Sequence, residues 1–199
     1  MGLVPVVLLL LPVAFIFRVH GWRAGVFFWP GSVRLEALSL VPADLPLELA
    51  TLGRELLALG FTFLGAHGEN PRLGPPLLAF DFISPEGVWA TLGPKARVYF
   101  LNATPGGLVL TAGFARRTAQ DARFVAIGMP RVPLARALAQ HRRRVARGET
   151  ATTLGGRLAL ARSFYGPDGA AELKRQHAIS VLWVVAAVLA VALALLRSL

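Results

Sequence analysis

The chain has 199 residues, carries a net charge of +10 at pH 7 and contains no cysteine, which excludes disulfides, thiolate metal sites and cysteine nucleophiles. Hydrophobic residues make up 55% of it and its mean hydropathy is +0.57, too apolar for an ordinary soluble domain. Such a basic chain attracts anionic lipid, acidic partners or nucleic acid. No basic stretch is interleaved with aromatic residues that could stack on bases, so no nucleic-acid partner is expected. A compositional preference for Ala, Leu, Gly, Pro and Arg also explains the charge.

The first apolar run covers residues 2–17 and predicts an N-terminal transmembrane anchor over residues 1–18. A secretory signal peptide is the alternative, and it would place a basic residue before its apolar core and small residues after it. Nothing basic precedes this run, and Arg18 follows it directly. A retained anchor is therefore favoured over a cleaved leader.

Residues 19–32 mix aromatic and basic side chains, which is typical of the boundary between lipid and water. The alternative interpretation places these aromatic residues in the core of the domain that follows. With the matching residues before the C-terminal apolar run, the predicted membrane-interface residues are Arg18, Trp22, Arg23, Phe27, Phe28, Trp29, Lys174 and Arg175.

Residues 33–165 predict a single α+β domain at the membrane surface. Leucines at the i, i+4, i+7 spacing predict an amphipathic helix over residues 46–59, and Pro133 and Gly148 suit the two ends of a second helix over residues 133–147. Between the helices, short apolar runs separated by turn residues predict strands. These runs are residues 61–65, 77–83, 88–92, 97–101, 108–114 and 123–128.

The expected fold class is therefore α+β: an antiparallel five- or six-strand meander flanked by two amphipathic helices, tethered by N- and C-terminal transmembrane helices. The Gly-rich residues 67–76 are expected to form a loop. Several strands are apolar on both faces, which indicates that the second face is also covered. A partner, the lipid or residues 152–165 could supply that cover.

Residues 166–199 predict a C-terminal transmembrane helix with a short lead-in, in which Asp168 is a plausible N-cap. Residues 179–196 contain no charge, Gly or Pro, and as a helix they would span roughly 27 Å. All basic residues except Arg197 lie between the two apolar runs. The positive-inside rule therefore places the domain in the cytoplasm and both ends of the chain outside.

No catalytic, cofactor-binding or metal-ligating residue is predicted, and no cofactor is expected. The histidines lack metal-ligand spacing, no serine lies in a nucleophile elbow, and the Gly-Gly pairs are interpreted as turns. Asp81 interrupts an apolar strand and is the carboxylate to inspect for burial, although a charge on an edge strand is the simpler explanation.

The densest basic cluster is a candidate contact for anionic lipid or an acidic partner. A solvated helix end is the alternative, because cations favour the C-terminal end of the helix dipole. For the histidine in the cluster, a hydrogen-bonded and partly buried position is the alternative. The cluster consists of His141, Arg142, Arg143, Arg144 and Arg147.

The alanines of the last apolar run allow a neighbouring helix to pack closely, whether the first span or another subunit. The leading hypothesis is a non-enzymatic accessory, assembly or scaffolding subunit of a larger membrane complex, with membrane lipids and a membrane protein or oligomer as partners. The alternative is a membrane-tethered domain that binds a small ligand or lipid headgroup, and an enzyme with a scattered site is the third possibility. A concave apolar pocket with a few convergent polar groups would favour ligand binding.

Overall fold

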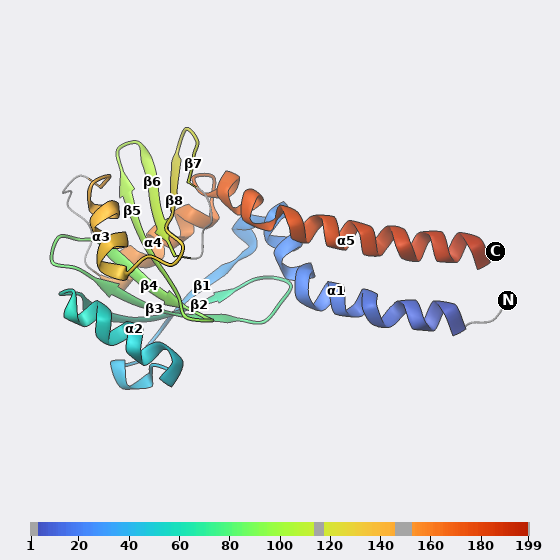
Figure 1. The fold of residues 1–199 in the computed structure, drawn as a ribbon, viewed down its shortest axis with the longest axis horizontal. Helices are drawn as coiled ribbons and strands as arrows, with labels where there is room; N and C mark the ends of the chain where they lie inside the picture. The colour runs from blue at the N-terminus through green and yellow to red at the C-terminus, as the bar shows by residue number, and fades with distance from the viewer. Residues whose placement is uncertain (1–3, 114–117, 146–152, 199) are drawn as a thin grey trace.

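The computed structural model describes residues 4–113, 118–145 and 153–198 of the chain. A β-sheet carries helices on both faces, and two long helices project from it side by side (Figure 1). These are α1 (Val4–Phe28) and α5 (Ala170–Ser198), which run antiparallel, so the N and C ends lie together, remote from the sheet.

Within the described residues the sheet has eight strands in the order β1-β2-β3-β4-β5-β6-β8-β7. Every neighbouring pair is antiparallel except β6 and β8, which run parallel because the short strand β7 carries the chain back first. The α+β class is confirmed, but the sheet is mixed and larger than the predicted five- or six-strand antiparallel meander. The strands are β1 (Arg34–Leu38), β2 (Thr62–Asn70), β3 (Leu77–Ile83), β4 (Trp89–Gly93), β5 (Arg97–Thr104), β6 (Gly107–Ala112), β7 (Ala119–Gln120) and β8 (Phe124–Gly128).

The loop predicted over residues 67–76 is wrong in its first part, because strand β2 continues to Asn70. The register of its pairing with β3 shifts between Phe63 and Gly65, where Gly65 has a φ of +141°. A bulge of this kind inserts an extra residue without ending the strand, and glycine is the residue that tolerates this backbone conformation. The glycines therefore bend β2 rather than terminate it.

Helices α2 (Leu47–Ala58) and α3 (Leu134–Arg142) cover one face of the sheet, as predicted. Pro46 precedes the first of them directly, and the second ends earlier than expected. Leu56 and Phe80 are completely buried in the core beneath these helices. Burying side chains of this size contributes about 1.5–3 kcal/mol each, so this core holds α2 and α3 on the sheet. The short 3-10 turns η1 (Pro30–Ser32) and η2 (Pro42–Asp44) flank β1.

Helix α4 (Leu154–Tyr165) covers the other face, so the described part of the predicted segment 152–165 supplies cover for the second apolar surface. The Thr153 hydroxyl accepts a hydrogen bond of 3.2 Å from the Gly156 N–H and caps the helix. Leu160 and Phe164 pack on apolar residues of β5, β6 and β8. The Gly-Gly pair at 155–156, interpreted from the sequence as a turn, lies instead in the first turn of α4.

A tight junction joins α4 to α5. At Gly169 a Cβ atom would lie 2.0 Å from the carbonyl oxygen of Phe164, so only glycine fits there. The first backbone bond of α5 runs from the Leu173 N–H to the Gly169 carbonyl, one residue after the predicted N-cap. The Asp168 carboxylate instead accepts hydrogen bonds from Ser163 (2.5 Å) and Arg123 (3.4 Å).

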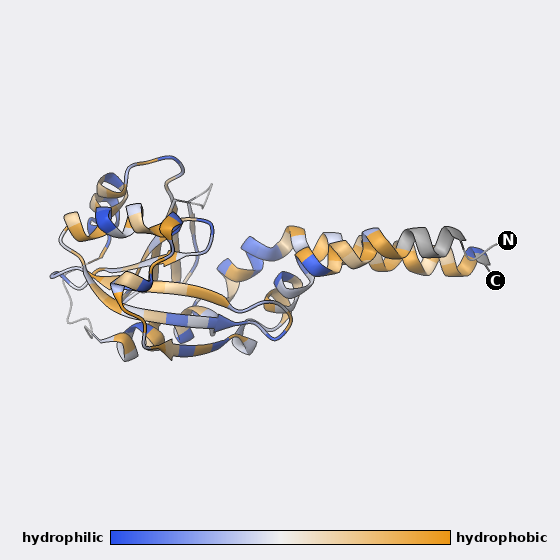
Figure 2. Ribbon diagram, turned by 90° about the horizontal axis from the view of Figure 1, so that it is seen from below, coloured by the Kyte–Doolittle hydropathy of each residue, from blue (hydrophilic) through white to orange (hydrophobic). Residues whose placement is uncertain are grey.

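Helices α1 and α5 pack through small and polar residues. Ser180 and Ala187 are buried in α5, and the His20 ring lies 3.1 Å from the Ser180 hydroxyl and stacks on Trp183. The neighbour that the alanines of α5 predict is therefore at least α1. Among the described residues one helix, α5 over Ala170–Leu196, is long and apolar enough to cross a membrane. Hydrophobic residues extend along its outer part, and most of them are exposed (Figure 2).

Candidate functional site: a pocket at the base of the helix pair

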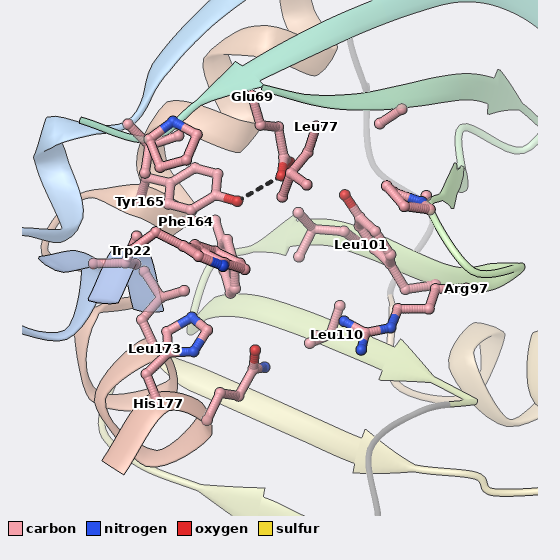
Figure 3. Close-up of a pocket in the computed structure, with 18 residues that line it drawn as sticks. Trp22, Glu69, Leu77, Arg97, Leu101, Leu110, Phe164, Tyr165, Leu173 and His177 are labelled. Carbon is pink, nitrogen blue, oxygen red and sulfur yellow. Dashed lines mark hydrogen bonds between the residues drawn. The ribbon is translucent and has the colours of Figure 1, made fainter. Parts of the chain in front are cut away.

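A pocket of about 130 Å³ lies where the helix pair meets the α4 face of the sheet (Figure 3). Three helices supply one side of it. These side chains are Trp22 and Val26 from α1, Leu173 and His177 from α5, and Phe164 and Tyr165 from α4.

The sheet supplies the other side of the pocket through residues that alternate along its strands. Leucines 77, 101 and 110 make this surface largely apolar, and Glu69 and Tyr99 add polar groups to it. Because side chains alternate between faces, these residues point to α4 while Phe80 and Phe100 point to the opposite core.

The loop between β2 and β3, whose Pro71 lines the pocket, packs against α1. Gly74 in this loop has a φ of +146°, and a Cβ atom there would lie 2.5 Å from the Cβ of Trp22. The loop and the helix therefore approach each other at a distance that only glycine permits. Leu73 of the same loop lies against Gly25 of α1.

A polar row crosses the sheet beneath α4, beside the pocket. Asp81, Thr91 and Tyr99 are direct cross-strand neighbours on β3, β4 and β5. Arg157 of α4 lies over this row: its Nε is 3.0 Å from the Asp81 carboxylate, and its guanidinium donates to the hydroxyls of Thr91 (2.9 Å) and Tyr99 (3.0 Å). Asp81 and Arg157 are both completely buried.

This position corrects the interpretation of Asp81 as an edge-strand charge, since β3 lies inside the sheet between β2 and β4. Burial alone would raise the pKa of Asp81, but the charge of Arg157 and the hydrogen bond from His67 outweigh burial and lower the pKa below its ordinary value. Asp81 is therefore a carboxylate at neutral pH.

His67 connects the buried ion pair to the pocket wall. Its Nδ1 lies 2.5 Å from the Asp81 carboxylate and its Nε2 lies 3.4 Å from Glu69. Burial lowers the pKa of His67, but the hydrogen bonds to Asp81 and Glu69 and the charge of Asp81 outweigh it and raise the pKa to about 8. His67 is consequently protonated at neutral pH and donates from both ring nitrogens.

Glu69 carries this network to the pocket surface. Its second carboxylate oxygen accepts a hydrogen bond of 2.8 Å from the Tyr165 hydroxyl (Figure 3). Burial and the Glu69 charge raise the pKa of Tyr165 well above its ordinary value, so this phenol stays neutral and remains a donor. The wall of the pocket therefore presents a fixed carboxylate.

The opposite side of the pocket is basic. Figure 3 shows the Arg97 side chain and the His177 ring across the space from Glu69, and Arg97 supplies the positive charge of this side. Trp22 contacts His177 edge-on at 5.9 Å between ring centroids, and the Arg23 guanidinium lies 5.2 Å from the Trp22 ring. The pocket therefore has an acidic and a basic side, separated by apolar walls.

The structure brings some of the predicted interface residues to this pocket and leaves others exposed. Trp22 is a pocket wall and packs against the domain, so the core interpretation of the aromatic residues applies to it. Phe28 and Trp29 are exposed at the domain end of α1. Phe27 and Arg23 are half-buried, Arg18 and Lys174 are exposed, and Arg175 pairs with Glu172.

The predicted basic cluster does not form one surface. His141 is completely buried, where its Nε2 donates to the Asn102 side-chain oxygen (3.1 Å) and its Nδ1 accepts from the Thr111 hydroxyl (2.9 Å). His141 is therefore not the surface contact for lipid or a partner that the sequence predicted. Its position fits the alternative, a hydrogen-bonded buried histidine. Arg142 pairs with Glu86 at 2.9 Å. Arg143 and Arg144 are exposed, and Arg147 lies outside the described residues.

Sequence reasoning did not identify Glu69, Tyr99, Arg157 or Tyr165. A signal existed for one of them: Arg157 shares a helical face with Leu154, Leu158 and Ala161, an apolar position that a charge occupies only when paired. No known family model, curated protein or solved structure matches the chain.

Proposed function

We propose that this chain is a membrane-tethered domain that binds the headgroup of a lipid in the pocket at the base of the helix pair. The observation that carries this proposal is the place of the pocket. Its walls are formed jointly by the sheet and by the domain ends of α1 and α5, so an occupant would lie beside the membrane surface.

The tether in this proposal consists of both long helices. In α5 an apolar segment long enough to span a bilayer is only 11% buried, and most of its large side chains are exposed. Exposed apolar helices of this length are costly in water. Because α1 lies antiparallel along α5, both helices would enter the same bilayer. The basic residues at their domain ends favour a domain on the cytoplasmic side.

The size of the pocket supports a headgroup rather than a whole lipid. At about 130 Å³, the space is close to that of an engineered apolar cavity of about 150 Å³ that binds benzene. A group of this size is a headgroup or a short part of a chain. The acyl chains of the ligand would therefore stay in the bilayer.

Binding rather than catalysis is supported by what the groups with shifted pKa values do. Burial raises the pKa values of Tyr99 and Tyr165, which line the pocket, so both phenols stay neutral at pH 7 and neither acts as a general base there. The pKa values of His67 and Asp81 are also shifted, but neither residue lines the pocket. Asp81 is paired with Arg157, and His67 bonds to Asp81 and Glu69.

The pocket is tested by filling it in the full-length protein. Ala79 of β3 lines the space and is buried, whereas Ala43 is exposed. We expect wild type and Ala43→Phe, purified in mild detergent, to retain lipid in native mass spectrometry, and Ala79→Phe to retain at least tenfold less. Wild type without lipid, or a folded Ala79→Phe with wild-type retention, would contradict the proposal. Should Ala79→Phe unfold, Val33→Trp at the half-exposed rim provides the same test.

An accessory-subunit role is the second proposal. The exposed Arg143 and Arg144 at the end of α3 support it, because this helix lies at the end of the domain away from the helix pair (Figure 1). These residues would therefore meet an acidic partner rather than the membrane. Recovery of the tagged protein in a stoichiometric complex, lost in Arg143→Glu/Arg144→Glu, would support this role. Recovery of the protein alone would contradict it.

A further inference from the structure

The acidic side of the pocket has the chemistry of an ammonium site. The side chain of Glu69 is 14% exposed, and its two oxygens accept hydrogen bonds from His67 and Tyr165. A carboxylate has about four lone-pair positions, so it can still accept from a ligand. The aromatic rings of Trp22, Phe164 and Tyr165 line the same pocket, and aromatic rings next to a carboxylate favour ammonium groups.

The basic side has the chemistry of a phosphate site. The Arg97 side chain reaches into the space opposite Glu69 and supplies the positive charge of this side (Figure 3). A guanidinium matches the geometry of a phosphate through two parallel hydrogen bonds. A group that joins a phosphate to an ammonium would therefore meet complementary charge at both ends.

The net charge on the acidic side of the pocket depends on the charged groups behind Glu69. Four charged groups form the cluster: Asp81 and Glu69 are negative, and Arg157 and protonated His67 are positive, so the cluster is neutral when His67 carries a proton. The other described side chains bonded to this cluster are uncharged. The Thr91 hydroxyl bonds to Asp81 and Arg157, and the phenols of Tyr99 and Tyr165, whose pKa values burial raises, bond to Arg157 and Glu69. When His67 loses its proton, near pH 8, the cluster gains one net negative charge.

We propose that the pocket selects zwitterionic headgroups, with the ammonium beside Glu69 and the phosphate beside Arg97. This inference rests on the binding function proposed above and specifies its ligand class. The shared chemistry is a phosphate joined to an ammonium by two carbons, as in phosphoethanolamine and phosphocholine. A membrane phospholipid is one source of this group, and the free soluble compound is the other.

The test compares lipids that differ in headgroup charge. The full-length protein is reconstituted into nanodiscs containing equal amounts of phosphatidylethanolamine and phosphatidylglycerol, and the lipids retained after extraction into detergent are quantified by native mass spectrometry. We expect wild type to retain phosphatidylethanolamine at least fivefold more than phosphatidylglycerol. Glu69→Gln should abolish this preference while still retaining lipid. Glu36→Gln, an exposed glutamate on β1, should behave as wild type.

The outcomes separate the two proposals. A wild-type protein that retains no lipid overturns the binding function itself. Retention without preference, a preference for phosphatidylglycerol, or a preference unchanged in Glu69→Gln overturns only the zwitterion site. Free phosphoethanolamine distinguishes the sources: displacement of retained lipid at millimolar concentration identifies the headgroup as sufficient, whereas no displacement identifies the intact lipid as the ligand.

A second measurement needs no variant. Choline does not titrate, so retention of phosphatidylcholine relative to phosphatidylglycerol should rise several-fold between pH 7 and 9, as His67 loses its proton and the charge behind Glu69 becomes negative. A ratio that stays constant or falls over this range would overturn the assignment of the ammonium group to Glu69.

Discussion

The Asp81–Arg157 ion pair joins helix α4 to the middle of the sheet. Removing two charges from water is costly, and their attraction compensates for this cost only when the remaining polar atoms are also bonded. Here Thr91, Tyr99 and His67 supply most of those bonds. The pair therefore fixes where α4 lies, and with it one wall of the pocket.

Loss of Arg157 should be severe, because it leaves a buried carboxylate without its cation. We expect Arg157→Met to reduce the free energy of unfolding by about 3–5 kcal/mol, measured by chemical denaturation in detergent. Arg162→Met, the same change at an exposed position of the same helix, should have little effect. Adding Asp81→Asn should restore part of the loss. Equal effects of the two arginine variants would mean that the buried pair does not position α4.

The buried residues His67 and His141 should make the free energy of unfolding depend on pH in opposite directions. The pKa of His67 is raised to about 8 in the folded chain, so its contribution is complete below pH 6.5 and is lost as pH rises through 8, about 2 kcal/mol in all. Burial lowers the pKa of His141 to about 4, so its contribution holds above pH 6.5 and is lost as pH falls through 4, about 3 kcal/mol.

Denaturation curves from pH 4 to 9 check this prediction. His67→Gln should flatten the alkaline side of the profile. His141→Gln should reduce the slope of the acidic side, to which the lowered pKa of Asp81 also contributes, and leave the alkaline side unchanged. Profiles parallel to wild type in both variants would contradict it.

Sequence reasoning identifies single residues only where a local rule applies. Asp81 could be singled out because a charge in an apolar strand is unusual, but its partner lies 76 positions away on another element. Glu69, Tyr99 and Tyr165 occupy positions with no distinctive pattern and meet only when the sheet, α4 and the helix pair pack together. The pocket is a product of long-range packing, which the sequence alone does not specify.

At the scale of elements, the periodic segments were predictable and the irregular ones were not. The helix over residues 46–59 and the pairs of strands β3–β4 and β5–β6 follow from apolar spacing and turn residues. Strand β1 was missed because it lies at the edge of the sheet and exposes Arg34 and Glu36. Edge strands commonly carry such charges, and these charges hide the alternation that marks a strand.

Because α1 packs on one face of α5, two adjacent alanines of α5 should differ in how well they tolerate a larger side chain. Ala187 is buried in the contact between the helices, whereas Ala186 is exposed. Ala187→Leu should force the helices apart and destabilise the pair by about 1–3 kcal/mol, lowering the midpoint of thermal unfolding in detergent. Ala186→Leu should leave it unchanged. The reverse order would show that a different face of α5 packs on α1.

At the scale of the whole molecule, the antiparallel helix pair makes a prediction about sidedness. If both helices cross one bilayer, the two ends of the chain lie on the same side and the domain on the other. The chain has no cysteine, so single introduced cysteines report their own accessibility. In intact cells a membrane-impermeant maleimide should label Arg197→Cys, and it should label Glu48→Cys, an exposed position of α2, only after permeabilisation. Labelling of both positions in intact cells would contradict a crossing.

The tight junction at Gly169 links the tilt of α5 to the shape of the pocket. Helix α5 is about 43 Å long and continues from α4 through a turn with no room for a side chain, while Arg157 anchors α4 to the sheet. Long apolar helices tilt more in thin bilayers than in thick ones. Because α4 is held on the sheet, a change in the tilt of α5 would move the domain end of α5, which forms part of the pocket wall. We therefore expect lipid retention to vary with acyl-chain length in nanodiscs even when the headgroup is held constant.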